Sequence, residues 1–532
     1  MANIGKALRH FLNLGNSSLK LNTLSNLFGS GWSALLNLIA VPIYLHYLGV
    51  EAYGIIGIFY TIQAFTALLD FGVSIIISRE LARLSAHPEN AQEMRDITRI
   101  TEITTWIMAA LIGLFLFALS PIVAMYWLQS EKLPVTTVSQ ALMIMSVGFV
   151  AQWTINFYTS GLVGLQRQYL LNVINSVCAT LRVVGGILIL AFVSSTIQSL
   201  LLWQAFISFV QAVIMAFAIR KCLPPASSPS RFRWNLLREK WRFAASVTTM
   251  GILGLILSQL DKVILSKMLS LEFFGYYILA TTISNMSLGL IARGVANAVY
   301  PRFSYLVSLN DQVKLCDLYH RSTQIVAALM LPVATLLIVF PYEILKLWTR
   351  NPVNAENTWL LLMLLAIATS LNGFLHIPYY LQLANGWTRI IITTALIGIC
   401  VITPTMLITV SYYGATAGAA SWLMVNFLTI IINVYSLHKY TLKGEQWKWY
   451  FVDIIKPFVV ALAVAFCGKL FLETDASQLK TLFILSITGF AAYALTALSL
   501  KSVRDLIWTS YKSYTRFAPQ GQIREDKSLW LN

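Results

Sequence analysis

Fourteen apolar stretches, each long enough to cross a membrane as a helix, dominate this sequence. About 20 mostly apolar residues span the hydrocarbon core of a bilayer, and charged residues or Gly, Pro and Asn mark the ends of each stretch. The predicted spans are residues 24–46, 53–78, 102–128, 136–163, 169–192, 196–219, 243–266, 274–300, 322–345, 357–384, 390–411, 413–437, 449–471 and 479–500. The chain is therefore predicted to be an all-α polytopic membrane protein, because a helix satisfies its own backbone hydrogen bonds in lipid.

The distribution of charge predicts how these spans are oriented. The formal net charge is +16, which in a soluble protein would suggest a nucleic-acid partner. In a polytopic membrane protein, however, excess cations usually lie in cytoplasmic loops. Of the 38 Lys and Arg residues, 28 fall on the side of the N-terminus, six on the other side and four within spans. We therefore expect both termini in the cytoplasm, a location in the cell inner membrane and no nucleic-acid partner.

Motifs for catalysis or metal binding are missing from the sequence. The five cysteines are scattered without a CxxC spacing, so neither a disulfide framework nor a metal cluster is indicated. The sequence also contains no phosphate-binding glycine loop, no paired-His zinc motif and no GxSxG nucleophile elbow. We expect no cofactor, no metal and no enzymatic activity.

Short segments recur at a nearly constant offset of 221 to 222 residues. YLGVEAYGIIGIF matches MLSLEFFGYYILA, which pairs Glu51 with Glu272 and Gly54 with Gly275, and two further glycines match at offset 222. The repeat predicts two six-span halves of the same orientation, as secondary transporters often have. The predicted units are an N-terminal lobe (1–222), a cytoplasmic basic linker (223–242), a C-terminal lobe (243–440), an appended helix pair (441–501) and a cytoplasmic tail (502–532).

The runs YLGVEAYGI, LLDFGVSIIISRELAR, GLVGLQRQ and SQLDKVILSKMLSLEFFGYY resemble those of the oligosaccharide flippases. These are the Wzx-type O-antigen unit translocases of the multidrug/oligosaccharidyl-lipid/polysaccharide exporter superfamily. The resemblance covers roughly residues 20–440. It implies two six-helix lobes around a central cavity, followed by a variable helix pair. It also implies alternating access, in which a polyprenyl-pyrophosphate-linked oligosaccharide is taken from the inner leaflet and released to the outer one.

Cations inside the spans are the candidates for binding such a substrate. A pyrophosphate cannot cross about 30 Å of hydrocarbon unaided, and the planar guanidinium of arginine binds phosphate through two hydrogen bonds. Arg182 lies halfway along the fifth span, Arg293 in the cytoplasmic half of the eighth, and Lys262 near the outer end of the seventh. We expect all three to face the cavity. The alternatives are a structural ion pair for Arg182 and snorkelling toward water for Arg293 and Lys262.

Asp70 and Asp261 are candidates for coupling transport to an ion gradient. Asp70 lies near the inner end of the second span, where the alternative role is a packing ion pair with Arg182 or Arg293. Asp261 precedes Lys262, but adjacent helix residues point about 100° apart, so the two are not expected to form a pair. The resemblance implies an acidic residue at the position of Asp261.

His376 is the third coupling candidate, because its titration range suits a proton. It lies beside Pro378, which can break the tenth helix and expose backbone carbonyls. The alternative is an ordinary interhelical hydrogen bond. Glu51 and Glu272 lie at the outer ends of spans two and eight, where we expect helix N-terminal charges or, alternatively, a part in outer gating.

The basic segment 231–242 alternates cations with Phe and Trp, as an interfacial helix would, and is expected to bind the head groups of membrane lipids. A glycan polymerase is a further possible partner. Two other functions stay open. A cation-coupled drug exporter of the same superfamily would need an acidic and aromatic cavity, which Arg182 and Arg293 oppose. A membrane glycan polymerase or ligase would need large outer loops, whereas the predicted ones are short.

Overall fold

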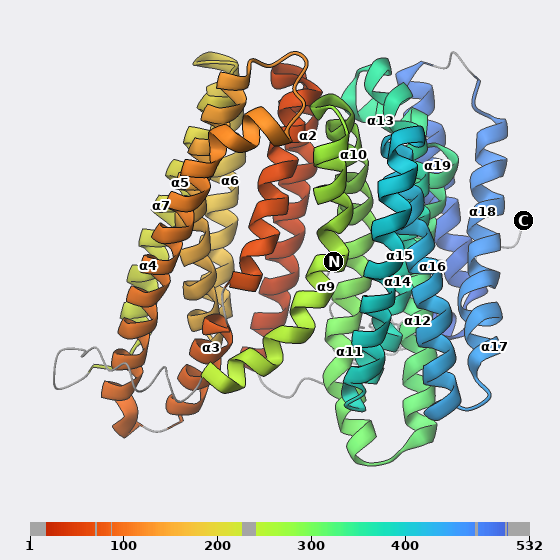
Figure 1. Cartoon of the computed structure of the whole chain (residues 1–532). Helices are drawn as coiled ribbons and strands as arrows, with labels where there is room; N and C mark the ends of the chain where they lie inside the picture. The colour runs from red at the N-terminus through yellow and green to blue at the C-terminus, as the bar shows by residue number, and fades with distance from the viewer. Residues whose placement is uncertain are drawn as a thin grey trace, which may run out of the picture.

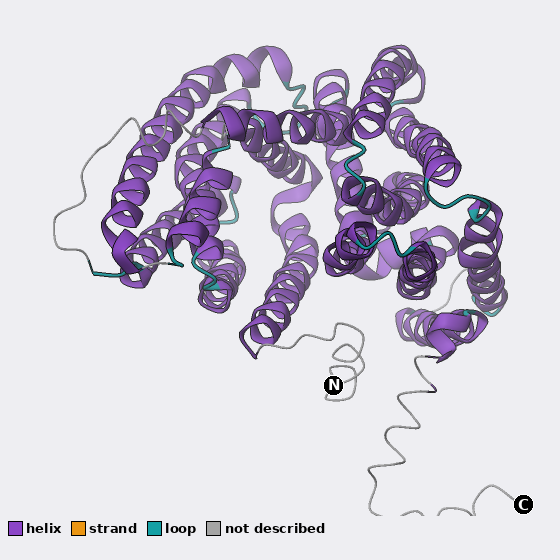
Figure 2. Ribbon diagram, turned by 90° about the horizontal axis from the view of Figure 1, so that it is seen from below, coloured by secondary structure: helices purple, strands orange, loops and turns teal. Residues whose placement is uncertain are grey.

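The computed structural model describes residues 17–69, 72–86, 88–225, 241–473, 477–505 and 508. Within these ranges the chain is helical and contains no strand (Figure 2). The long helices are α2 (Ser17–Leu69), α4 (Ala91–Ile122), α5 (Val135–Gly164), α6 (Gln168–Phe192), α7 (Ile197–Cys222), α9 (Trp241–Met268), α12 (Gln312–Val339), α14 (Pro352–Ala384), α15 (Thr388–Tyr413), α16 (Ala415–Tyr440) and α19 (Gln478–Ser499). Shorter helices are α3 (Val73–Leu84), η1 (Pro88–Asn90), α10 (Leu271–Ser284), α11 (Leu290–Ser308), α13 (Pro341–Thr349), α17 (Gln446–Lys448) and α18 (Lys456–Leu470). Three π-helical turns, η2 (Val123–Trp127), η3 (Asn285–Gly289) and η4 (Trp449–Ile455), join or extend neighbouring helices.

Twelve helical segments of the described chain are long and apolar enough to cross a membrane. One of them lies in α2, which changes direction at Gly49 (φ 80°, ψ 171°) and so holds both of the first two predicted spans. The seventh predicted span, 243–266, is not among these twelve segments, but it coincides with α9. The all-α polytopic fold is confirmed, and the total of fourteen spans stays a prediction.

Two details of the predicted spans are wrong. The second span does not run unbroken from 53 to 78, because α2 ends at Leu69 and Gly72 adopts a left-handed conformation (φ 76°) before α3 begins. Glycine takes this conformation without the strain that a side chain would add. Pro378 does not break its helix either, since α14 continues through it to Ala384. Membrane helices tolerate such a proline when neighbouring groups satisfy the freed carbonyl.

The helices form two bundles that lie side by side (Figures 1 and 2). Helices α2 to α7 make the N-terminal lobe, and α10 to α16 make the C-terminal lobe. Helix α9 runs obliquely between them: it packs on α15 and α16 through Leu257 and Leu265, and it also contacts α2 and α3. Helices α18 and α19 pack on α12 at the far side of the C-terminal lobe.

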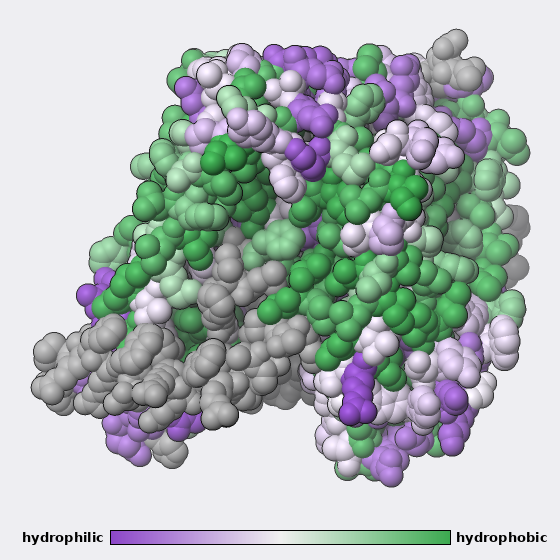
Figure 3. Space-filling view, viewed as in Figure 1, coloured by the Kyte–Doolittle hydropathy of each residue, from purple (hydrophilic) through white to green (hydrophobic). Residues whose placement is uncertain are grey.

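The lobes approach most closely where α2 meets α10. A Cβ atom added to Gly275 would lie 2.3 Å from the carbonyl oxygen of Val50, and one added to Gly54 would lie 2.6 Å from that of Leu271. Glycine therefore allows two backbones to touch here. Hydrophobic side chains cover the middle of the visible face of the molecule, and hydrophilic side chains gather at its two ends (Figure 3). This is the surface expected of a protein that crosses a bilayer.

Candidate functional site

Arg182 lies in the interior of the N-terminal lobe, midway along α6. Its Nη2 donates to Gln211 Oε1 at 2.9 Å and to Ser208 Oγ at 3.2 Å, both on α7. Its Nε atom is buried without a hydrogen-bond partner. Because a guanidinium carries five N–H donors, the side chain keeps donors available for a ligand.

A small pocket, partly open to solvent, surrounds this guanidinium between α2, α5, α6 and α7. Tyr60, which is 52% exposed, belongs to its lining. The lining residues are Phe59, Tyr60, Gln63, Ile144, Met145, Gly148, Gln152, Arg182, Leu201, Gln204, Ala205 and Ser208. The pocket thus combines one cation with three glutamines, a tyrosine and a serine.

The partners of Arg182 are all neutral. Gln211, whose Oε1 accepts the hydrogen bond from Arg182, donates in turn through Nε2 to Asn175 Oδ1 at 3.0 Å. Ser208 donates to the carbonyl oxygen of Gln204 at 2.8 Å. Within the described part of the chain, no carboxylate forms an ion pair with Arg182. The pocket can therefore bind an anion together with groups that accept and donate hydrogen bonds, as sugar hydroxyls do.

The sequence interpretation identified Arg182 but missed the neutral residues around it. A signal was present, because Gln204, Ser208 and Gln211 are spaced four and three residues apart in an otherwise apolar stretch. This spacing puts the three side chains on one face of α7. Asn175 and Arg182 share a face of α6 in the same way.

Arg293 and His376 lie close together in the C-terminal lobe. Arg293, on α11, is exposed, and its Nε donates to the carbonyl oxygen of Gly289 at 3.2 Å. It lies within electrostatic range of His376 and Tyr380 on α14. Tyr380 donates to Asn297 Oδ1, one turn beyond Arg293. These polar side chains of α11 and α14 form a cluster in the C-terminal lobe.

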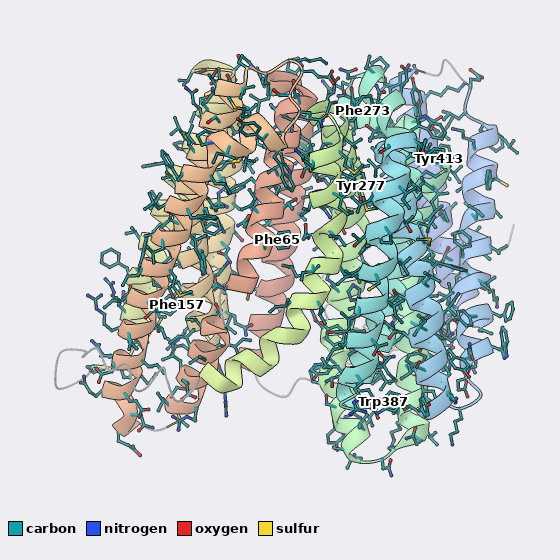
Figure 4. The ribbon with its side chains drawn as sticks, in the orientation of Figure 1. Phe65, Phe157, Phe273, Tyr277, Trp387 and Tyr413 are labelled. Carbon is teal, nitrogen blue, oxygen red and sulfur yellow. The ribbon has the colours of Figure 1, made fainter. Side chains whose placement is uncertain are left out.

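Asp261 and Lys262 form a pair, which contradicts the sequence expectation. The Nζ atom of Lys262 lies 3.2 Å from Asp261 Oδ1 and donates to the carbonyl oxygen of Ser258 at 3.0 Å. The expectation considered only the directions in which the two side chains leave the helix, whereas the flexible lysine stem folds back. Asp261, 3% exposed, also accepts a hydrogen bond from Tyr277, which is labelled in Figure 4.

Asp70 and most of the segment 231–242 lie outside the described residues. The proposed roles of Asp70 in coupling, or in an ion pair with Arg182 or Arg293, therefore stay predictions, as does the binding of lipid head groups by the basic segment.

Glu51 holds the connection between α4 and α5. Its carboxylate, in a residue that is 4% exposed, accepts hydrogen bonds from the backbone N–H groups of Glu131 (2.7 Å), Lys132 (3.0 Å) and Leu133 (3.1 Å). It also lies in the first turn after the kink at Gly49, as the interpretation of a helix N-terminal charge requires. The contacts to the loop were not predicted.

The same connection docks on the other lobe. The carbonyl oxygen of Gln129 accepts from the backbone N–H of Leu271 at 2.7 Å, and Trp127 Nε1 donates to Ser266 Oγ at 3.0 Å. Lys132 forms an ion pair with Glu272, and this hydrogen bond raises the pKa of the lysine. We call residues 126–133, docked on residues 266–272, the outer seal. It joins the lobes at the end where the positive-inside pattern predicts the outer side.

Comparison with solved structures identifies this arrangement of helices. The lipid II flippase MurJ in an inward closed conformation superposes with a TM-score of 0.67 at 16% identity, covering 92% of this chain and 99% of that one. An inward-facing multidrug resistance MATE family transporter of the MOP superfamily gives 0.62 at 15% identity, covering 75% and 92%. A MOP superfamily transporter from Pyrococcus furiosus gives 0.54 at 16% identity, covering 79% and 94%. The chain shares the fold of these transporters, which is the fold that the resemblance in the sequence implies.

The family follows from the sequence itself. A family model described as "Polysaccharide biosynthesis protein" matches residues 47–349, more than half of the chain. The chain therefore belongs to the polysaccharide biosynthesis protein family. A comparison with curated protein sequences gives no match.

Proposed function

We propose that this protein is a flippase that moves a polyprenyl-pyrophosphate-linked oligosaccharide, such as an O-antigen or capsule repeat unit, from the inner to the outer leaflet of the cytoplasmic membrane. The observation that carries the proposal is Arg182, a cation in the middle of a spanning helix. Among the described residues it bonds only to neutral groups, and it keeps an unused donor in a polar pocket. Such a cation attracts a pyrophosphate, and the surrounding amides suit sugar hydroxyls.

The arrangement of the lobes supports the direction of transport. The outer seal and the α2–α10 contact close one end of the interface between the lobes. In the proposed orientation, with both termini in the cytoplasm, the closed end faces outward. The protein would then be ready to receive substrate from the inner leaflet, and Arg293, exposed on α11, would provide a second cation on the path.

A drug exporter of the same superfamily is the competing function. A cationic drug requires carboxylates or an aromatic cage, whereas Arg182 and Arg293 would repel it. For the third possibility, a glycan polymerase or ligase, the connection between α4 and α5 is informative. It is short, and its residues form the outer seal rather than an active site.

The cavity cations can be tested by replacing Arg182 and Arg293 with alanine, singly and together, in cells that depend on this gene for surface polysaccharide. We expect export to fall roughly tenfold or more for the double variant, since each hydrogen bond to a charged group contributes about 1.5–3 kcal/mol. Arg→Lys should restore export only in part, because an ammonium cannot bind phosphate through a planar fork. The matched control is Arg389→Ala, an exposed arginine at the start of α15.

Protein levels must be measured for every variant. Full export by a normally expressed Arg182→Ala/Arg293→Ala variant would refute the role of the cavity cations. A defect of equal size in Arg389→Ala would show that the assay responds to any lost arginine.

We infer that titratable groups in the spans couple transport to an ion gradient. We propose Asp70, Asp261 and His376 as the residues that bind the coupling ion. The Asp261 carboxylate is balanced by Lys262 and Tyr277, so a proton or cation that neutralises it would release the lysine. The test measures transport into proteoliposomes under an imposed proton or sodium gradient for Asp70→Asn, Asp261→Asn and His376→Gln. A gradient response that survives in all three variants would refute the proposal.

A further inference from the structure

Three potential metal ligands converge where α12 meets the connection between α16 and α17. Cys316 and His320 lie four residues apart on α12 and so share one face of the helix. Glu445 comes from the residues just before α17. One ligand atom from each of the three, a sulfur, a ring nitrogen and a carboxylate oxygen, lies within 4.8 Å of the others.

The imidazole of His320 is held in a fixed orientation. Its Nδ1 bonds to the carboxylate of Asp453, which is fully buried in η4. The other oxygen of Asp453 accepts from Gln324 Nε2 at 2.7 Å. The Nε2 atom of His320 consequently faces Glu445 Oε2, 3.0 Å away. A histidine whose second nitrogen is bound by a carboxylate is the usual arrangement around protein-bound zinc.

We propose that Cys316, His320 and Glu445 form a zinc site that fastens the appended helix pair to the C-terminal lobe. A thiolate, an imidazole and a carboxylate are the three ligand types that Zn²⁺ uses in proteins. With bonds of about 2.0 to 2.3 Å, the ligand atoms of a tetrahedral site lie roughly 3.3 to 3.7 Å apart. The spacing in this cluster therefore needs only small side-chain adjustments to accept the ion.

The surroundings leave room for those adjustments. Lys448, whose Nζ lies 3.1 Å from Glu445 Oε2, has a side chain that is 52% exposed and can move into solvent when the metal takes its place. The fourth coordination position would go to water, because the cluster offers three ligands. His438 on α16 is also incompletely bonded: it is 3% exposed, and within the described part of the chain its Nε2 has no hydrogen-bond partner.

Such a site would join three parts of the chain, in addition to the packing of η4 and α18 on α12. Cys316 and His320 belong to the C-terminal lobe, Glu445 to the connection that follows α16, and Asp453 to the appended helix pair. The cluster lies beside segments that the positive-inside pattern predicts to be cytoplasmic, where thiols stay reduced. The metal would act as a structural clip, outside the proposed substrate path.

The test measures zinc on the purified full-length protein in detergent after treatment with a chelator. We expect one equivalent of Zn²⁺ to rebind, and Co²⁺ in its place to give the intense absorption of a thiolate-to-cobalt transition. Cys316→Ser should abolish that absorption and weaken zinc binding at least a hundredfold, and Asp453→Asn should weaken it about 10- to 100-fold. Cys222→Ser, at a half-buried cysteine that ends α7, is the matched control and should change neither.

Two results would overturn the proposal. One is a protein that retains no zinc at micromolar concentrations of the free ion. The other is zinc binding that Cys316→Ser and Cys222→Ser affect equally, which would indicate adventitious binding to thiols. Because serine is nearly isosteric with cysteine, and Cys316 is only half-buried, the variant is expected to fold. Its folding is checked by size-exclusion chromatography.

Discussion

Replacing Glu51 by glutamine tests how the outer end of the protein stays closed. The carboxylate accepts three backbone hydrogen bonds from residues 131–133 and so holds the connection that docks on the other lobe. A hydrogen bond to a charged group contributes about 1.5–3 kcal/mol. Glutamine keeps one oxygen acceptor but turns an NH₂ group toward backbone donors. We take the net loss as about 2 kcal/mol, the equivalent of one such bond.

This loss should change the population of molecules with an open outer seal. About 1.4 kcal/mol corresponds to a factor of ten, so about 2 kcal/mol corresponds to roughly a thirtyfold increase in the open fraction. The reporter is a cysteine in place of Thr282, which lies behind the seal on α10 and bonds to Tyr53 at 3.0 Å. A membrane-impermeant maleimide is applied to intact cells, and labelling above that of the parent chain is followed over time. We expect Glu51→Gln to raise the labelling rate at position 282 about thirtyfold.

The control for this experiment is Glu131→Gln, the same chemical change at an exposed residue of the same connection. It should leave the labelling rate unchanged. A cysteine at position 131 reports which side of the membrane the connection faces, and it should be labelled in every background. If the cysteine at position 131 is labelled from outside but Glu51→Gln leaves the rate at position 282 unaltered, the seal does not depend on this carboxylate and the reasoning fails.

Two further predictions concern stability. A Cβ added to Gly164 would lie 2.4 Å from the carbonyl oxygen of Ser78, so Gly164→Ala should destabilise the N-terminal lobe by about 1–3 kcal/mol. A thermal-unfolding assay in detergent measures this loss. The control is Gly251→Ala, where the added Cβ meets open space and stability should not change. Lys262→Met leaves the buried Asp261 carboxylate without its cation and should cost about 3–5 kcal/mol. The double variant Lys262→Met/Asp261→Asn should recover most of the lost thermal stability, and a double variant as unstable as the single one would argue against the ion pair.

The helical architecture could be predicted because the membrane imposes it. An apolar stretch of sufficient length has few alternatives to a spanning helix, so the composition alone indicated the fold class. Arg182 could also be identified, since a charge in such a stretch is conspicuous. The break before Gly72 was missed because only the backbone angle (φ 76°) distinguishes it from a glycine that continues a helix.

The polar clusters could not be predicted, because their members come from distant parts of the chain. His320 and Asp453 are 133 residues apart, and Glu51 contacts a loop 80 residues away. A single sequence gives no information on which helices are neighbours. The expectation of no metal site rested on the lack of a CxxC spacing. It did not consider the proposed kind of site, in which a cysteine and a histidine one helical turn apart are joined by a glutamate far away in the sequence.

The contact between Gly54 and Gly275 has a mechanical consequence. These two residues are equivalent positions of the two halves, so each half meets its own counterpart there, as in an isologous dimer. A point that lies on such a local two-fold axis can serve as a pivot, and movement then grows with distance from it. Twenty residues along a helix, about 30 Å away, a turn of about 10° displaces the chain by about 5 Å. A single methyl group added at this pivot would therefore displace the opposite end of the lobes most, where the substrate is expected to enter.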